Sequence, residues 1–315
     1  MGYCNSASQK SAETAEEAKG SRMRLITTVA DHPEYSAGLY VLVRLLRHLG
    51  CSLPVQCWHD EDRPNDPVIC AALENLGTSF HPLPGTRAFH AKCFPAIWPT
   101  MAGGSAEVLY LDSDCYPVRN PEEVFDWPAY RRHGALFWPN FRASDPSRWR
   151  KLGMEAPAEP EFETGQYVVD LSRCREAMER GHRNCNDPRI FGPVFRDDQE
   201  CLHLAFIETG TPYDMIDTLP RMELHTIINH DIHGSVFTQH RVADKFRLKN
   251  WSCFWTHQRS DEMIRHRVLV NEDLHFGFFD EFAALVGHDG PVPGFPWCAK
   301  CGRRQCRCRM REVTS

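Results

Sequence analysis

The sequence predicts an α/β fold in which helices flank a central sheet. From Arg24 onward, short apolar and β-branched runs alternate with segments of helical periodicity, which is typical of parallel strands joined by right-handed crossovers. The chain has 315 residues, of which 42% are hydrophobic and 25% charged, enough apolar material for one large α/β domain. This size and composition exclude a peptide-sized scaffold and a globally disordered chain.

The first half of the chain supplies its elements in regular alternation. A strand is expected at 25–30, where the β-branched run LITTVA ends at a polar turn. A helix is expected at 37–49, because five apolar side chains recur there at helical spacing and Gly50 can end it. The elements expected next are a strand at 55–59, a helix at 67–76, a strand at 79–83 and a helix at 88–101 that Pro95 and Pro99 break or kink.

The next strand, AEVLYLDSD at 106–114, carries the strongest functional signal. Its apolar run stops abruptly at two carboxylates, Asp112 and Asp114, which share one face of an extended backbone. Open parallel sheets bind ligands beyond the carboxyl ends of their strands. Two like charges so close are costly unless a cation joins them, and carboxylate oxygens suit Mg²⁺ or Mn²⁺ bound together with phosphates. We therefore predict a metal site here, with a solvated turn as the alternative.

The second half is less regular and contains no visible internal repeat. Strands are expected at 134–139, 165–170 and 233–238, and helices at 171–180 and 198–208. Residues 1–22 carry too few large apolar side chains to offset the entropy lost on ordering. We expect three parts: a disordered arm at 1–22, one domain at 23–287, and an irregular Cys- and Arg-rich tail at 288–315.

Four blocks of the sequence resemble the glycosyltransferases of A-type fold. They are residues 92–126, 134–139, 163–170 and 197–206, in the same order, and the resemblance covers about residues 24–250. It points to the fungal α-mannosyltransferase group and its glycogenin-like relatives. The resemblance implies a Rossmann-like central mixed sheet flanked by helices. It also implies transfer of a hexose from a UDP- or GDP-linked sugar to an acceptor hydroxyl of a glycan, protein or small molecule, with retention of configuration.

The resemblance assigns metal and phosphate ligands. It implies that Asp112 and Asp114 hold a divalent metal, Mn²⁺ or Mg²⁺, on the donor diphosphate, and that a late histidine is the third ligand. His240 is the preferred candidate, and His230 and His233 are the alternatives, because the spacing from histidine to lysine is longer here than in the family. Two lysines would contact the donor phosphates: Lys92 and Lys245.

The resemblance also implies which residues contact the transferred sugar and the nucleotide base. Glu163 and Gln166, with Thr164 between them, would face the transferred sugar, and Asp198 resembles an acidic residue near that sugar. A helix cap is the alternative for Asp198. The loop after the first strand would hold the base and ribose through Asp31 and Tyr35, for which ordinary loop and helix-start roles are the alternatives. In this interpretation the catalytic residues are Asp198, Gln166 and Glu163, and no side chain is named as a nucleophile.

The C-terminal tail has a cysteine cluster of its own. Four thiols within eleven residues could bind a structural Zn²⁺, although their spacing departs from the usual two-knuckle pattern, and a reduced flexible tail is the alternative. These cysteines are Cys298, Cys301, Cys306 and Cys308. The neighbouring arginines are the one locally basic segment, which could contact nucleic acid or another polyanion. The net charge of the whole chain, −6, has the wrong sign for a protein that binds nucleic acid through its overall charge.

No stretch of about 18 apolar residues occurs, and the N-terminus lacks the apolar core of a secretory signal, so we expect a cytoplasmic protein without a transmembrane segment. Gly2 with Ser6 matches an N-myristoylation pattern, and Cys4 could carry a palmitoyl chain, which leaves lipid anchoring as an alternative. Two other functions stay open at this point: a metal-dependent nucleotidyltransferase and a non-catalytic zinc-bearing adaptor.

Overall fold

The computed structural model describes residues 23–30, 35–60, 65–83, 106–141, 143–223, 226–241 and 270–286. Several predictions concern residues outside these ranges. They are the arm at 1–22 with Gly2 and Cys4, the helix at 88–101, the tail at 288–315 with its four cysteines, and the candidate ligands Asp31, Lys92 and Lys245.

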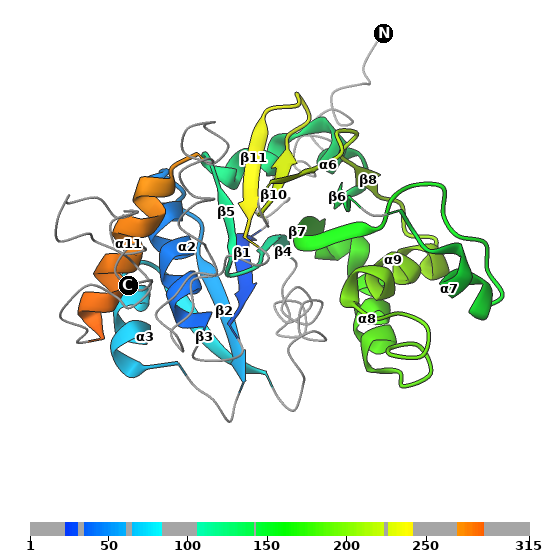
Figure 1. The fold of residues 1–315 in the computed structure, drawn as a ribbon, viewed down its shortest axis with the longest axis horizontal. Helices are drawn as coiled ribbons and strands as arrows, with labels where there is room; N and C mark the ends of the chain where they lie inside the picture. Colours follow the sequence, from blue (N-terminus) through cyan, green and yellow to red (C-terminus); the bar gives the residue numbers. More distant parts are fainter. Residues whose placement is uncertain are drawn as a thin grey trace, which may run out of the picture.

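A seven-stranded mixed sheet forms the centre of the described structure (Figure 1). Its order is β3 (Thr78–Leu83), β2 (Val55–Asp60), β1 (Met23–Val29), β4 (Ala106–Leu111), β7 (Phe162–Asp170), β6 (Ala135–Pro139) and β8 (Asp214–Met215). Strands β1 to β4 are parallel, as the alternation in the first half predicts, whereas β7 runs antiparallel to both β4 and β6. The predicted α/β fold with a central mixed sheet flanked by helices is confirmed.

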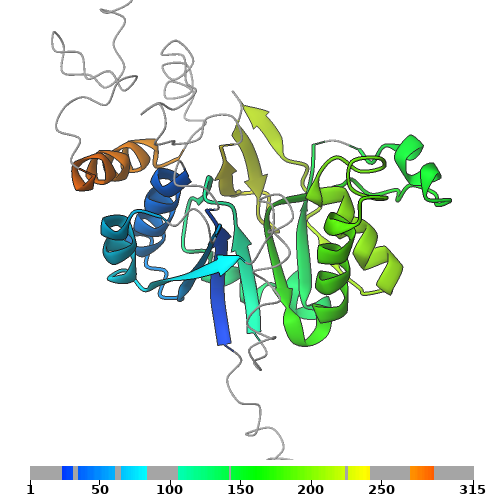
Figure 2. The ribbon, with the colours of Figure 1, turned by 90° about the horizontal axis from the view of Figure 1, so that it is seen from below.

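Helices cover both faces of this sheet (Figure 2). One group comprises α2 (Ser36–His48), α3 (Pro67–Glu74) and α11 (Glu272–Leu285), and the other α8 (Leu171–Asn186) and α9 (Asp198–Thr209). Strand β4 contributes to both layers, because Leu109 and Leu111 belong to the apolar core on the α2 side, whereas Val108 and Tyr110 belong to the core on the α8 side. Shorter helices complete this part: η2 (Pro121–Asp126), α6 (Pro128–His133) and α7 (Pro146–Lys151).

A second, antiparallel sheet begins where β4 ends. Its order is β5 (Cys115–Pro117), β11 (Val236–His240), β10 (Thr226–His230) and β9 (Arg221–Glu223). The strand predicted at 233–238 starts later because residues 231–235 form a turn. The Asp231 Oδ1 atom accepts hydrogen bonds from the backbone N–H groups of His233, at 2.7 Å, and Ser235, at 2.8 Å. The prediction for this strand was therefore wrong by three residues at its start.

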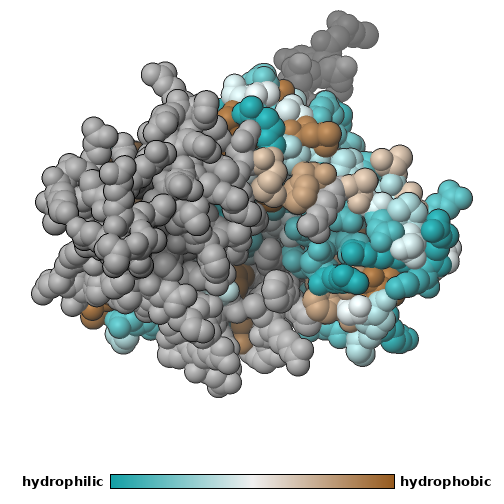
Figure 3. Space-filling model, in the orientation of Figure 1, coloured by the Kyte–Doolittle hydropathy of each residue, from teal (hydrophilic) through white to brown (hydrophobic). Residues whose placement is uncertain are grey.

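The remaining boundaries agree closely with the predictions, except that β7 begins at Phe162 and α8 continues to Asn186. None of the helices in the described ranges combines the length and the apolar character that crossing a bilayer requires. On the face seen in Figure 3, hydrophilic side chains predominate over the described part, with smaller apolar areas among them.

Candidate active site

The two predicted carboxylates lie on the turn that joins the two sheets. The backbone N–H of Asp112 donates to the carbonyl of Gly165 on β7, at 2.8 Å, and the Asp114 carbonyl accepts from the backbone N–H of Arg241, at 2.9 Å. The Asp112 carbonyl also accepts from the N–H of Cys115, at 2.9 Å, which closes the turn. The turn is thereby fixed between β7 of the central sheet and the end of β11, and both aspartates are buried.

His240, at the end of β11, faces both carboxylates. Its Nε2 atom lies 3.5 Å from Asp112 Oδ2 and 3.4 Å from Asp114 Oδ1. One ligand atom from each of the three residues lies within 4.8 Å of the other two, and no other group of this kind occurs among the residues that the structure describes. The structure therefore brings His240, rather than His230 or His233, to the two aspartates.

These three side chains suit a divalent cation. Two carboxylate oxygens and an imidazole nitrogen are ligands that Mn²⁺ accepts, and carboxylates suit Mg²⁺. Around them, further contacts fix the ligand atoms: the Glu163 Oε1 atom lies 2.9 Å from His240 Nδ1, and the Tyr110 hydroxyl donates to Asp112 Oδ1 at 2.6 Å. With Nδ1–H donated to Glu163, the imidazole would direct an Nε2 lone pair toward the carboxylates once Nε2 has lost its proton, which is the form that a metal ligand needs.

In the absence of a metal, the charges around His240 favour the protonated imidazole. Burial lowers the pKa of its imidazole, but the neighbouring carboxylates of Glu163 and Asp114 more than offset this and raise the pKa to about 10. In the metal-free site the proton on the ring thus balances part of the carboxylate charge. A metal would replace that proton, because only the neutral imidazole coordinates.

Gly165 makes room for the ring. A Cβ atom at this position would lie 2.8 Å from Glu163 Oε1 and closer still to His240 Nδ1 and Cε1. The Gly165 N–H also donates to Glu163 Oε1, at 3.0 Å, so that this carboxylate bridges β7 and the histidine. On the other side of the turn, Gly38 of α2 approaches Ser113, where a Cβ would lie 2.9 Å from the Ser113 carbonyl oxygen.

Gln166 and Asp198, the other two predicted catalytic residues, are buried in polar contacts. The Gln166 amide oxygen accepts from the hydroxyl of Thr238 and from Cys115 Sγ, the latter at 3.7 Å. Asp198 Oδ2 accepts from the Thr164 hydroxyl at 2.6 Å. The cap of α9 is Asp197, whose side chain accepts from the N–H of Glu200, so the capping role considered for Asp198 falls to its neighbour.

The remaining candidates do not belong to the three-residue cluster. Tyr35 is at the start of α2 and packs against the apolar core on that side of the sheet. His230 is the last residue of β10, and burial is the main cause that lowers its pKa. His233 lies in the turn that Asp231 organises.

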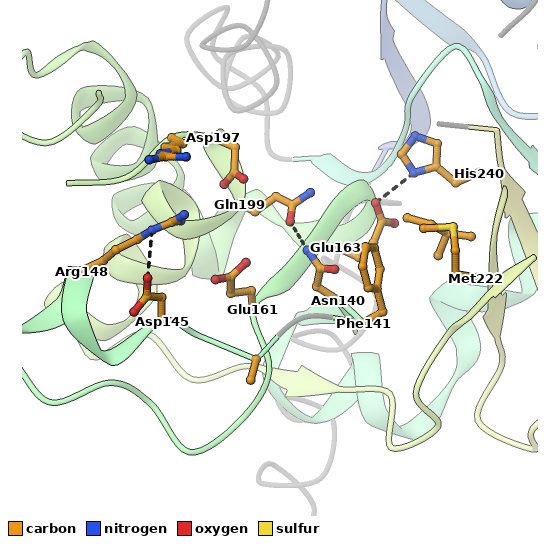
Figure 4. Close-up of a pocket in the computed structure, with 13 residues that line it drawn as sticks. Asn140, Phe141, Asp145, Arg148, Glu161, Glu163, Asp197, Gln199, Met222 and His240 are labelled. Carbon is orange, nitrogen blue, oxygen red and sulfur yellow. Dashed lines mark hydrogen bonds and ion pairs between the residues drawn. The ribbon is translucent and has the colours of Figure 1, made fainter. Parts of the chain in front are cut away.

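A cavity of about 480 Å³ extends from the cluster toward α7 and α9 (Figure 4). It is lined by Asn140, Phe141, Ala143, Asp145, Arg148, Glu161, Glu163, Arg196, Asp197, Gln199, Met222, Ile227 and His240. Of these, only Glu163 and His240 were among the candidates from the sequence. Glu161 could have been recognised by its spacing of two from Glu163, which places both on one side of an extended strand.

The sequence comparisons identify a family. A family model with the description "Mannosyltransferase putative" matches residues 25–187, which is 163 of the 315 residues. The chain is also 35% identical over 149 residues to the "Alpha-1,2-mannosyltransferase MNN22" of Candida albicans. That match covers 44% of this chain but only 25% of the relative, so the chain spans about a quarter of the length of the curated relative it matches.

Three glycosyltransferases are among the solved structures whose backbones resemble that of this chain. The mannosyltransferase Ktr4p from S. cerevisiae in complex with GDP has a TM-score of 0.47 and 10% identity, over 67% of this chain and 71% of its own. The galactosyltransferase LgtC, in complex with donor and acceptor sugar analogues, has a TM-score of 0.42 and 16% identity, over 57% and 69%. The glycosyltransferase GlyE of Streptococcus pneumoniae TIGR4 has a TM-score of 0.42 and 15% identity, over 63% and 46%.

Proposed function

The chain belongs to this mannosyltransferase family, and we propose that it is a metal-dependent glycosyltransferase that moves a hexose from a nucleotide sugar to an acceptor hydroxyl. The observation that carries the proposal is the cluster of Asp112, Asp114 and His240 at the end of β4, beside a cavity. Mannose is the hexose to test first, because the Candida relative is named a mannosyltransferase. The proposal includes UDP or GDP as the nucleotide of the donor.

In the proposed mechanism, Asp112, Asp114 and His240 would hold Mn²⁺ or Mg²⁺. When bound, such a cation neutralises negative charge that develops on the departing diphosphate. Glu163 keeps the His240 ring oriented through Nδ1, and the Tyr110 hydroxyl holds one oxygen of Asp112, so that the other oxygen faces the histidine. Because these groups are already in place, little reorganisation is needed when the donor binds.

The remaining assignments are part of the same proposal. Glu163, Gln166 and Asp198 would lie at the transferred sugar, and Tyr35 at the start of α2 would contact the nucleotide from the N-terminal half of the sheet. We propose transfer with retention of the anomeric configuration, without a side chain that acts as nucleophile. Lys92 and Lys245 would contribute further charge to the donor phosphates.

Slow hydrolysis of the donor tests this function without knowledge of the acceptor. GDP-mannose and UDP-hexoses are incubated with the protein and Mn²⁺, and release of free sugar and nucleoside diphosphate is measured. Asp112→Asn with Asp114→Asn should abolish this release, and so should removal of the metal by a chelator. Asp217→Asn is a matched control, because Asp217 is an exposed aspartate outside the cluster.

The products separate the alternatives. A nucleotidyltransferase would release pyrophosphate from a nucleoside triphosphate and a sugar phosphate, whereas a non-catalytic adaptor would give no metal-dependent turnover with any donor. Either outcome would contradict the proposed glycosyl transfer.

A further inference from the structure

Two buried cysteines lie against each other where helix α8 ends and helix α9 begins. Cys185 is in the last turn of α8 and Cys201 in the first turn of α9, and both are fully buried. They belong to the same apolar core, and the two helices lie side by side (Figure 1). The two thiol groups are hydrogen-bonded to each other. Both residues carry thiols in this structure, which therefore shows the reduced form of the pair.

This contact between two sulfur atoms differs from those of other thiols in the described part of the chain. Three of these donate instead to oxygen atoms of the protein: Cys70 to the Asn65 carbonyl, Cys115 to the Gln166 amide and Cys174 to the Gly134 carbonyl. A thiol is a weak donor and its sulfur a weak acceptor, so a hydrogen bond between two thiols contributes little to stability. A covalent bond at the same place would contribute considerably more.

The residue before Cys185 fixes the spacing of the two helices. Asn184 is buried, and its Nδ2 atom donates to the Cys201 carbonyl at 3.4 Å and to Glu208 Oε2 at 3.1 Å. The backbone of Cys201 is thus held by the direct neighbour of Cys185. A disulfide requires sulfur atoms about 2.05 Å apart. Because the thiols are already in contact and lie in terminal helical turns, which fray most readily, a small approach of the two sulfur atoms is enough.

The two cysteines enclose the segment that leads into α9. This segment, residues 186–200, contains three of the residues that line the cavity: Arg196, Asp197 and Gln199. Neither cysteine belongs to the candidate metal cluster. A bond between them would restrict opening of the segment while leaving the metal ligands unchanged.

The surroundings make the pair unreactive in the folded protein. The hydrogen bond with Cys185 and burial raise the pKa of the Cys201 thiol, and the carboxylates of Asp198 and Asp197 act in the same direction. The thiolate is the nucleophile in disulfide exchange, and a dissolved oxidant does not reach a fully buried sulfur. We therefore expect a bond to form while residues 186–200 are still open during folding, and to be protected once they have packed.

We propose that Cys185 and Cys201 form an intramolecular disulfide when the chain folds in the presence of a small-molecule disulfide such as oxidised glutathione. One cysteine thiolate attacks the oxidised glutathione, releases one glutathione thiolate and leaves a mixed disulfide on the protein. The other cysteine thiolate attacks the protein sulfur of this mixed disulfide and displaces the second glutathione thiolate. Two protein thiols are oxidised, one glutathione disulfide is reduced to two thiols, and the two protons pass to the glutathione thiolates. This inference does not depend on the proposed function.

Peptide mapping detects the bond directly. The full chain is refolded from denaturant with oxidised and reduced glutathione, the remaining thiols are alkylated, and the protein is digested with trypsin without reduction. Cys185 and Cys201 then lie in two different peptides, 184–189 and 197–221, neither of which contains another cysteine. We expect these two peptides to be linked, and to separate on reduction. Peptides that carry glutathione, an alkyl group or another cysteine of the chain in place of this link would overturn the proposal.

Thermal unfolding measures the effect of the bond. Closure of a loop of about 15 residues should raise the Tm of the oxidised wild type above that of the reduced one by about 5–10 °C. Cys185→Ala and Cys201→Ala should each abolish this difference. Cys174→Ala should keep it, and is the matched control because Cys174 is also a buried residue of α8 but contacts a carbonyl. Each variant is compared with itself in the two redox states, so any cost of the substitution to folding cancels. A difference that persists in Cys185→Ala would contradict the proposal.

Hydrogen exchange locates the effect in the chain. Amides of residues 187–197 should exchange about tenfold or more slowly in the oxidised wild type than in the reduced one, because the bond limits local opening of this segment. The reduced and oxidised forms of Cys201→Ala should exchange alike. Equal exchange in the two forms of the wild type would show that no bond closes the segment.

Discussion

Replacement of Gly165 by alanine should disable the candidate metal site while leaving the fold intact. The added Cβ would lie 2.8 Å from Glu163 Oε1 and nearer still to the His240 ring, whereas carbon and its neighbours prefer separations of about 3.5–4.0 Å. The His240 ring must therefore move by about 1 Å, and Glu163 by less. These movements disturb the 2.9 Å contact that orients the imidazole.

The size of the effect follows from this displacement. Loss of a group that orients a metal ligand typically costs about 10- to 100-fold in metal affinity or activity. Overpacking of a buried site costs about 1–3 kcal/mol of stability, which a domain of this size can tolerate. We expect Gly165→Ala to bind Mn²⁺ about 10- to 100-fold more weakly and to lose donor hydrolysis to a similar extent.

The assay combines Mn²⁺ titration by electron paramagnetic resonance, donor hydrolysis and thermal unfolding. Gly277→Ala is the matched control, because a Cβ there meets no atom within 4 Å and the residue lies inside helix α11. That control should be neutral or stabilising by up to about 1 kcal/mol, from helix propensity alone. If Gly165→Ala is folded and binds Mn²⁺ as tightly as the wild type, the described packing of the ring at the site is wrong.

Three further predictions concern titratable groups. Glu163→Gln removes a carboxylate that raises the pKa of His240, so NMR titration of the metal-free variant should find that pKa below about 10, and an unchanged value would contradict the contact. Burial raises the pKa of Glu161 to about 8, so the native state holds a proton that the unfolded chain releases above the ordinary value of about 4.5; the free energy of unfolding should therefore decrease between pH 5 and 8, and denaturant titration of Glu161→Gln should show a smaller decrease. Burial lowers the pKa of His203 to about 4, so the unfolded chain binds a proton that the native state excludes as the pH falls below the ordinary value of about 6.5. The free energy of unfolding should then decrease by up to about 3 kcal/mol between pH 7 and 4 from this group, and denaturant titration of His203→Gln should show a smaller decrease.

The sequence predicted the N-terminal elements and the turn of Asp112 and Asp114 because these are local patterns. The helix at 36–48 has a continuous apolar stripe, and β4 is an apolar run that ends at two charges. His240 was harder to assign, since its place beside the aspartates depends on the pairing of β11 with β5. Such a pairing between residues more than one hundred positions apart leaves no periodic signal.

The late start predicted for β7 and the missed cavity residues have a common physical cause. Strand β7 is buried along its whole length, but its first residues include Glu163, Thr164 and Gln166, which do not resemble a buried strand. These polar side chains are tolerated in the interior because they have hydrogen-bonding partners on other elements. Glu163 contacts His240 of β11, and the Thr164 hydroxyl donates to Asp198 of α9. The cavity residues Asn140 and Gln199 were missed for the same reason, because only the fold brings the two amides together.

The position of the site at the junction of two sheets suggests that metal binding and docking of the sheets are coupled. Asp112 and Asp114 join β4 to β5, His240 belongs to β11 of the small sheet, and Glu163 belongs to β7 of the central one. Asp112, Asp114 and Glu163 place three carboxyl groups around one histidine in a buried cluster, so repulsion among carboxylates would oppose the docked arrangement. A divalent cation at this position would offset that repulsion, and it would need ligands from the turn after β4 and from β11 at once. Saturation with Mn²⁺ at about 100 times its dissociation constant should therefore stabilise the wild-type protein by about 2.7 kcal/mol. Asp114→Asn should be less destabilising without metal than with it, because the substitution removes a ligand and a repulsive charge at once. Equal destabilisation of this variant with and without Mn²⁺ would show that the cluster is structural.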